Sequence, residues 1–142
     1  MLFKFTTAFI LLSLTVMINV TGLTMVLRRL HVAEVAASPR VWPASWLLIR
    51  LAAWVVAVHL IAISLCAWFF WWQNCLPDFM TAFYFSIITY TTVGYGDVVL
   101  TADWRLLAGV EALTGILMCG LSTGYFFTVV HRLYSHGAQD RT

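Results

Sequence analysis

Residues 78–97 read DFMTAFYFSIITYTTVGYGD, a short apolar segment that runs directly into a loop with two glycines. The apolar part, from Asp78 to Tyr90, is too short to cross a hydrocarbon core, because about 20 helical residues are needed to span roughly 30 Å. We therefore predict a re-entrant helix followed by irregular backbone at membrane depth. Such backbone is tolerated only where protein buries it or where it lines a water-filled path.

Three longer apolar runs surround this segment. They extend from Phe5 to Leu27, from about Trp46 to Trp72 and from about Leu106 to Val130, and each is long enough to span a bilayer. The chain of 142 residues is 62% hydrophobic and 10% charged, whereas soluble domains are about half apolar and about a quarter charged. So short a chain cannot bury that much apolar surface in its own core. The composition predicts an all-α membrane protein and argues against soluble enzymes, nucleic-acid-binding proteins and disordered proteins.

The loop after the apolar segment has a spacing that suits ion coordination. Its glycines, Gly94 and Gly96, are two residues apart and allow positive φ at alternate positions at little steric cost. Backbone that alternates in this way points successive carbonyls to one side. Four such chains around an axis would stack rings of oxygen, with the Thr92 hydroxyl as the innermost ring, and such rings replace the water shell of a monovalent cation. One chain supplies a quarter of each ring, so the geometry requires an oligomer.

The loop resembles the Thr-Val-Gly-Tyr-Gly selectivity filter of potassium channels, and the flanking Thr89, Thr91 and Asp97 also fit that family. The resemblance covers residues 47–133. It implies an outer helix, a pore helix, the filter and an inner helix, assembled as a homotetramer in a membrane. The residues implied to form the filter are Thr92, Val93, Gly94, Tyr95 and Gly96, with K⁺ held at the first four. The implied function is passive K⁺ permeation with no catalysis and no cofactor besides the permeant ion.

The side chains of the loop have separate predicted roles. Val93 and Tyr95 should point away from the ions and pack against the pore helices. Asp97 should lie at the outer mouth, where four copies would concentrate cations. Hydrogen bonds that brace the filter are the other role predicted for Asp97, and the two roles are compatible.

Two positions behind the loop depart from the family pattern. Some members carry a glutamate that pairs with the final aspartate, and this position is Ile88 here. A tryptophan common in the family is replaced by Phe85, which cannot donate a hydrogen bond, so Tyr84 and Tyr90 are the alternative donors. The resemblance therefore implies that Tyr84, Phe85 and Ile88 support the filter. The departures concern its stability and inactivation rather than its selectivity.

Polar residues inside the predicted spans are further candidates. Glu111 is one because an ionisable group at that depth is costly. We expect it to be protonated and hydrogen-bonded behind the filter, with a pair to Arg105 as the alternative. His59 is either a packed neutral histidine or a pH sensor, since histidine titrates near neutrality. Asn19 in the first span is one possible partner for it.

The third span carries residues expected to line and gate the path. Gly115 resembles the family's hinge glycine. Together with Gly120 it either bends the helix or only lets helices approach closely. Helical spacing places one face toward the cavity, made of Ile116, Cys119, Thr123 and Phe127. Phe126 or Phe127 is predicted to form a hydrophobic constriction that gates by dewetting, and counting does not decide between them.

The charges orient the chain across the membrane. Arginines lie between the first two spans and aspartates between the last two; they are Arg28, Arg29 and Arg40, and Asp78, Asp97 and Asp103. We predict a multi-pass protein of the plasma or inner membrane, with its N-terminus outside and its C-terminus in the cytoplasm. No span repeats arginine at every third position, and the segment after Val130 is short. We therefore expect neither a voltage sensor nor a cytoplasmic ligand domain.

The predicted organisation has three parts. Residues 1–45 form an additional N-terminal span and linker, residues 46–133 the pore domain, and residues 134–142 a short tail. We expect the polar face of the first span, including Ser13, Asn19 and Thr24, to face protein. A cleaved signal peptide is the alternative for that span.

The cysteines and the competing functions complete the predictions. Cys66, Cys75 and Cys119 are too scattered for a zinc site, and Cys75 is either a free thiol or a disulfide between subunits. A poorly selective cation channel and a non-conducting accessory protein are the competing functions, and the intact filter residues argue against the first. No catalytic set is recognisable, so an enzyme is not expected.

Overall fold

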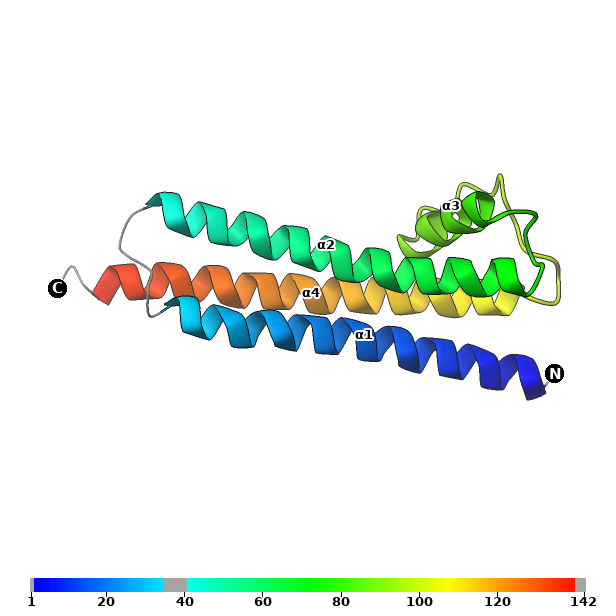
Figure 1. Ribbon diagram of the computed structural model, residues 1–142, viewed down its shortest axis with the longest axis horizontal. Helices are drawn as coiled ribbons and strands as arrows, with labels where there is room; N and C mark the ends of the chain where they lie inside the picture. Colours follow the sequence, from blue (N-terminus) through cyan, green and yellow to red (C-terminus); the bar gives the residue numbers. More distant parts are fainter. Residues whose placement is uncertain (1, 35–40, 140–142) are drawn as a thin grey trace.

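The computed structural model describes residues 2–34 and 41–139, and within them every regular element is an α-helix. The helices are α1 (Leu2–Glu34), α2 (Val41–Trp72), α3 (Phe79–Tyr90) and α4 (Arg105–Gln139). The long helices α1, α2 and α4 lie side by side, and the short α3 packs against α2 and α4 at one end of the bundle (Figure 1). The predicted all-α membrane fold is confirmed.

Three of these helices contain segments long and apolar enough to cross a membrane: Phe9–Val26, Ser45–Trp72 and Arg105–His131. The apolar α3 has 12 residues and is too short to span. The predicted set of three spans and one short helix is therefore confirmed. The ends of the long helices differ from prediction, because α1 continues to Glu34 and α4 continues to Gln139, into the predicted tail. The sequence around residue 131 loses apolar character but holds no proline that would end a helix.

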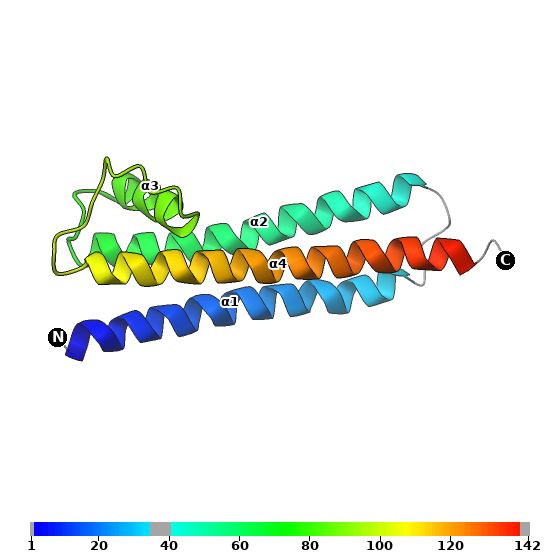
Figure 2. The same cartoon turned by 180° about the vertical axis from the view of Figure 1, so that it is seen from behind.

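The first residues of α1 lie at the same end of the bundle as α3, and the last residues of α4 lie at the opposite end (Figure 1 and, from behind, Figure 2). The C-terminal half of α1 and the N-terminal half of α2 lie far from α3 (Figure 1). These halves contain Arg28 and Arg50, which are both exposed. The Arg29 side chain and all of Arg40 are outside the described part of the chain. The fold therefore places Arg28 and Arg50 away from the loop, whereas Arg105 lies at the loop end, where α4 begins.

The contact between α1 and α2 is close because a glycine lies in it. A Cβ added to Gly22 would meet Val58 Cγ2 at 2.7 Å. Trp54 Nε1 also donates a hydrogen bond to the Gly22 carbonyl oxygen, at 3.1 Å. Small residues at helix contacts let backbones approach in a membrane.

The polar face of α1 agrees with prediction only in part. Thr15 and Asn19 are buried against the other helices. Ser13 and Thr24 are exposed in the single chain, so their predicted contact with protein is not made within it. The Thr24 hydroxyl donates to the Val20 carbonyl oxygen of its own helix at 2.7 Å. A hydroxyl satisfied in this way does not need a protein neighbour.

An aromatic core fixes α3 on the bundle. Phe85 of α3 is buried and meets Phe70 of α2 edge to face, with ring centroids 5.5 Å apart. Phe69 meets Trp104 in the same way at 5.8 Å. Edge-to-face pairs of this kind add to the stability gained from burial alone. The core thereby sets the position from which the loop after α3 starts.

Candidate functional site

The start of α3 is fixed by a side-chain cap. Asp78 has extended backbone, its Oδ1 accepts from the Thr81 N–H at 2.9 Å, and its Oδ2 accepts from the Thr81 hydroxyl at 2.7 Å. These bonds satisfy a helix N–H that has no partner within the helix. The backbone bond from Thr81, followed by its hydroxyl bond, lowers the pKa of Asp78 below the ordinary value. Asp78 therefore stays ionised at the positive end of the helix dipole.

In the loop after α3, residues with positive φ alternate with residues that do not have it. Positive φ occurs at Thr92 (62°), Gly94 (53°) and Gly96 (77°), whereas Val93 and Tyr95 between them do not have it. The glycine spacing predicted the last two positions. Thr92 was not foreseen, because a left-handed residue with a side chain costs about 1–2 kcal/mol. Strained backbone of this type persists where the surrounding structure holds it, and it gathers at functional sites.

Backbone hydrogen bonds hold the first half of the loop against α3. The Thr92 N–H donates to the Thr89 carbonyl oxygen at 2.9 Å, and the Gly94 N–H donates to the Ile88 carbonyl oxygen at 3.0 Å. Ile88 itself is buried, so its side chain anchors the helix while its carbonyl supports the loop. These bonds occupy the N–H groups on one side of the loop. The last turn of α3 thereby holds Thr92 in its strained backbone conformation.

The side chains of the loop are not covered within one chain. Val93 is 51% exposed and Tyr95 is 73% exposed. The predicted packing of these two side chains against a pore helix is absent within a single chain, since both side chains are more than half exposed. Any such packing needs the helix of another copy.

Asp97 is braced by the pore helix, and Tyr84 is the residue that does so. Tyr84 Oη donates to Asp97 Oδ2 at 2.7 Å. This bond lowers the pKa of Asp97 below its ordinary value, and it raises the pKa of Tyr84. Of the two predicted donors, Tyr84 therefore makes the contact. Phe85, which cannot donate, is buried in the aromatic core.

Replacing Tyr84 with phenylalanine is expected to raise the pKa of Asp97 toward the ordinary 3.8, because the phenol bond is the main cause of its depression. In the wild type any stability from this bond is complete above pH 3.8 and is lost as the pH falls through the lower folded-state pKa. The measurement is a ¹³C NMR titration of the aspartate carboxyl groups in detergent. Asp78 is the internal control and should titrate alike in both proteins. An Asp97 titration that does not move would show that the bond is absent in solution.

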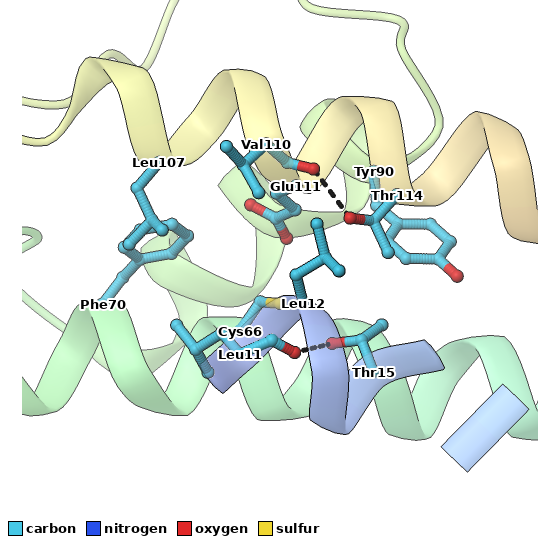
Figure 3. A pocket seen from close by; sticks show the side chains of 10 residues that line it. All are labelled: Leu11, Leu12, Thr15, Cys66, Phe70, Tyr90, Leu107, Val110, Glu111 and Thr114. Atoms are coloured by element: carbon cyan, nitrogen blue, oxygen red, sulfur yellow. Dashed lines mark hydrogen bonds between the residues drawn. The ribbon is translucent and has the colours of Figure 1, made fainter. Parts of the chain in front are cut away.

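Glu111 lies buried between the helices behind α3. It is 6% exposed, and it points into a cavity of about 20 Å³ (Figure 3). A cavity of this size has room for one water molecule. The lining residues come from all four helices: Leu11, Leu12, Thr15, Cys66, Phe70, Tyr90, Leu107, Val110, Glu111 and Thr114. Figure 3 also shows the Thr15 and Thr114 hydroxyls bonded to carbonyls of their own helices.

Glu111 makes neither the predicted hydrogen bonds behind the filter nor the alternative pair with Arg105 by direct contact within the described residues. Both carboxyl oxygens are without a hydrogen-bond partner among the described residues, and so is the buried Ser86 hydroxyl of α3. Ser86 and Cys66 are its polar neighbours. The alternative pair with Arg105 is wrong, because Arg105 Nε donates to the Leu100 carbonyl oxygen at 3.2 Å. Six residues along a helix place the two side chains on different faces.

The predicted cavity face of α4 is uncovered in the single chain. Ile116, Cys119, Thr123 and Phe127 are all exposed. Phe127 is 67% exposed, whereas Phe126 is only partly so, which makes Phe127 the better candidate for a constriction. Within the described residues of one chain, none of the three cysteines forms a disulfide. A disulfide between subunits through Cys75 stays a prediction.

The two glycines predicted as hinges differ in their surroundings. A Cβ added to Gly115 would meet the Tyr90 carbonyl oxygen at 1.9 Å, whereas one added to Gly120 would meet nothing within 4 Å. Gly115 therefore lets the end of α3 lie directly on α4. The packing role is thus visible at Gly115 and not at Gly120.

His59 joins three helices near the middle of the bundle. Its Nδ1 is 3.0 Å from Tyr90 Oη of α3, and its Nε2 is 3.0 Å from Ser122 Oγ of α4. Asn19, the predicted partner, instead donates to the Thr15 carbonyl oxygen of its own helix at 2.9 Å. Ser122 was missed by the sequence reasoning. It lies seven residues after Gly115 and thus on the same helix face, a spacing that could have identified it.

Comparison with known proteins shows that the sequence of this chain is similar to those of ion channels. Residues 48–132 match a family model described as an ion channel. A relative, the two-pore potassium channel 4 of Arabidopsis thaliana, is 38% identical over 64 residues, which are 44% of this chain and 22% of that protein. The chain therefore corresponds to only a small part of that relative. No solved structure matches the chain.

Proposed function

The chain belongs to the ion channel family that it matches over residues 48–132, and on that premise we propose that it forms a potassium-selective channel. Four copies would surround one pore, and K⁺ would pass through it down the electrochemical gradient. The coordinating groups would be Thr92, Val93, Gly94, Tyr95 and Gly96. The family is one of channels and not of enzymes, and no cofactor besides the permeant ion is invoked.

The observation that carries this proposal is the alternating backbone at Thr92, Gly94 and Gly96. Alternation lets consecutive carbonyl oxygens face one side, as dehydration of a monovalent cation requires. The Thr92 and Gly94 N–H groups donate to the Thr89 and Ile88 carbonyl oxygens, and the carbonyl oxygens of residues 92–96 accept none of these backbone bonds. The loop carbonyls would therefore be available to an ion. The name of the Arabidopsis relative, a potassium channel, supports K⁺ as the permeant ion.

A homotetramer is supported by what one chain leaves uncovered. Tyr95 at the loop and Ile116 and Phe127 on α4 are large apolar side chains that are each more than half exposed. A lipid-facing position would suit the α4 residues alone, but not a loop that carries Asp97 beside Tyr95. We place the loop and this face of α4 around the common axis. The face formed by Ile116, Cys119, Thr123 and Phe127 would then line the cavity.

We assign roles to the residues around the filter from where they lie relative to it. Asp97 is held by Tyr84, and its four copies would form a ring of carboxylates at the outer mouth. Phe85, Ile88 and Glu111 would support the filter from behind. Gly115 and Gly120 would be the places where α4 can change its curvature. Each of these roles is part of the proposal.

The orientation is proposed from the charges at the two ends of the bundle. Arg28 and Arg50 lie away from the loop, and Asp97 lies on it. The positive-inside rule then places the loop outside and the end of α4 in the cytoplasm of the plasma or inner membrane. We likewise propose residues 1–45 as an added span and linker, 46–133 as the pore domain and 134–142 as a tail, of which 140–142 lie outside the described residues.

The test is cation flux into proteoliposomes that hold the purified protein, with K⁺ and Na⁺ compared under matched gradients. A flux of K⁺ that greatly exceeds that of Na⁺ and is blocked by Ba²⁺ is expected. Equal Na⁺ flux would indicate a poorly selective channel. No flux from a preparation verified as tetrameric by mass spectrometry would favour a non-conducting accessory protein.

A further inference from the structure

His59 of α2 lies within hydrogen-bond distance of two hydroxyl groups, one at the end of α3 and one at the middle of α4. Tyr90, at one end of this connection, is the last residue of α3 and is 1% exposed. It lies two residues before the strained Thr92. Ser122, at the other end, is 5% exposed and lies beyond Gly120 toward the cytoplasmic end. One side chain of α2 thus links the base of the loop to the middle of α4.

The Ser122 hydroxyl differs from its neighbours on α4. The Thr114, Thr123 and Thr128 hydroxyls each donate to the carbonyl oxygen four residues earlier in the same helix. Ser122 instead faces another helix. A hydroxyl that gives up the local bond for a longer connection constrains the distance between the two helices.

Histidine is suited to both bonds at once. A neutral imidazole has one nitrogen that donates and one that accepts, and hydroxyl groups do either. If Nδ1–H donates to Tyr90, then Nε2 accepts from Ser122, and the other tautomer reverses both directions. Either way all three groups are satisfied without charge. The aromatic rings of His59 and Tyr90 also meet edge to face, with centroids 5.8 Å apart.

Tyr90 contacts α4 at two levels. Its carbonyl oxygen lies directly against Gly115, and its phenol reaches Ser122, seven residues further along, through His59. A bend of α4 between these levels, at Gly115 or Gly120, would keep the first contact and pull Ser122 away from His59. The two bonds are therefore compatible with the nearly straight α4 seen in Figure 1 and not with a strongly bent one.

We propose that His59 is a positioning residue that latches α4 straight and couples the curvature of that helix to the base of the loop. Breaking either bond would favour bending of α4 and relax the hold on Tyr90. The inference rests on the proposed channel function, because it concerns how that channel changes between open and closed states.

The test is a double-mutant cycle with His59→Phe and Ser122→Ala, read out as the open probability of single channels in planar bilayers. Hydrogen bonds between membrane helices are worth about 0.6 kcal/mol on average, so each change is expected to alter the open-to-closed ratio about threefold per chain. Both single variants should shift the open-to-closed ratio in the same direction. The double variant should shift it no further than His59→Phe alone. Ser64→Ala is the matched control, because that hydroxyl donates to Leu60 of its own helix.

A cycle on thermal melting in detergent accompanies the recordings and does not depend on conduction. Non-additive melting with additive open probabilities would overturn the latch, since the bond would then be structural only. Additive effects in both readouts would overturn it as well. If His59→Phe fails to assemble, Tyr90→Phe with Ser122→Ala gives the same cycle through an intact imidazole. A wild-type tetramer that carries no K⁺ would instead refute the proposed function, and the melting cycle would still decide whether the connection exists.

Discussion

Replacing Gly94 with alanine is expected to reduce K⁺ flux in proteoliposomes to background. Gly94 has a φ of 53°, and an added methyl group would meet nothing within 4 Å in the single chain. The effect within one chain is therefore conformational. An L-residue in this region costs about 1–2 kcal/mol, or roughly 4–8 kcal/mol in the four copies of the proposed pore, which is about 10³-fold or more in the population of correctly formed loops.

The control for this substitution is Gly109→Ala. Gly109 is exposed, lies within α4, has no positive φ and also has open space around its Cβ position. Alanine is the better helix former by about 1 kcal/mol, so flux and stability should be retained. A D-alanine placed at Gly94 by chemical ligation adds the same methyl group but favours positive φ, and it should restore flux. Wild-type flux in the L-alanine variant would show that the alternating backbone is not required for conduction.

The spans and the short helix were predictable from the sequence because they depend on local features. Apolar runs of sufficient length, such as residues 46–72, specify a helix in lipid almost regardless of neighbours. The short apolar segment was predicted to run from Asp78 to Tyr90, and the observed cap of α3 is Asp78. The extension of α4 beyond the apolar run was missed because hydropathy measures the lipid-soluble part of a helix and not its end.

The connections between helices were less predictable, because they depend on rotation about each helix axis. His59, Asn19 and Glu111 were all recognised as polar groups in apolar spans, yet each was assigned an incorrect or incomplete partner. A rotation of one residue, about 100°, moves a side chain from one neighbour to another. The positive φ of Thr92 could not be predicted for a different reason. Threonine does not favour this conformation, and hydrogen bonds to α3 hold it there.

A packing role and a hinge role can be distinguished at Gly115, and its replacement by alanine is expected to destabilise the protein, unlike alanine at Gly109 or Gly124 of the same helix. The new Cβ would lie 1.9 Å from the Tyr90 carbonyl oxygen and 2.8 Å from its carbonyl carbon. Because these are backbone atoms, no side-chain rotation relieves the overlap. Overpacking of a well-packed contact costs typically about 1–3 kcal/mol, against about 1 kcal/mol gained from alanine's helix propensity.

Thermal melting of the purified protein, followed by K⁺ flux, distinguishes the two roles of Gly115. A packing role predicts that Gly115→Ala melts well below the wild type and loses flux, because Tyr90 can move only by displacing Thr92 two residues later. The matched control is Gly124→Ala, a glycine of the same helix whose added Cβ would meet nothing within 4 Å. It should melt at or above the wild-type temperature. If Gly115→Ala melts like this control and changes only the open probability, then Gly115 is a hinge, and the close approach of Tyr90 to α4 is not what the residue is needed for.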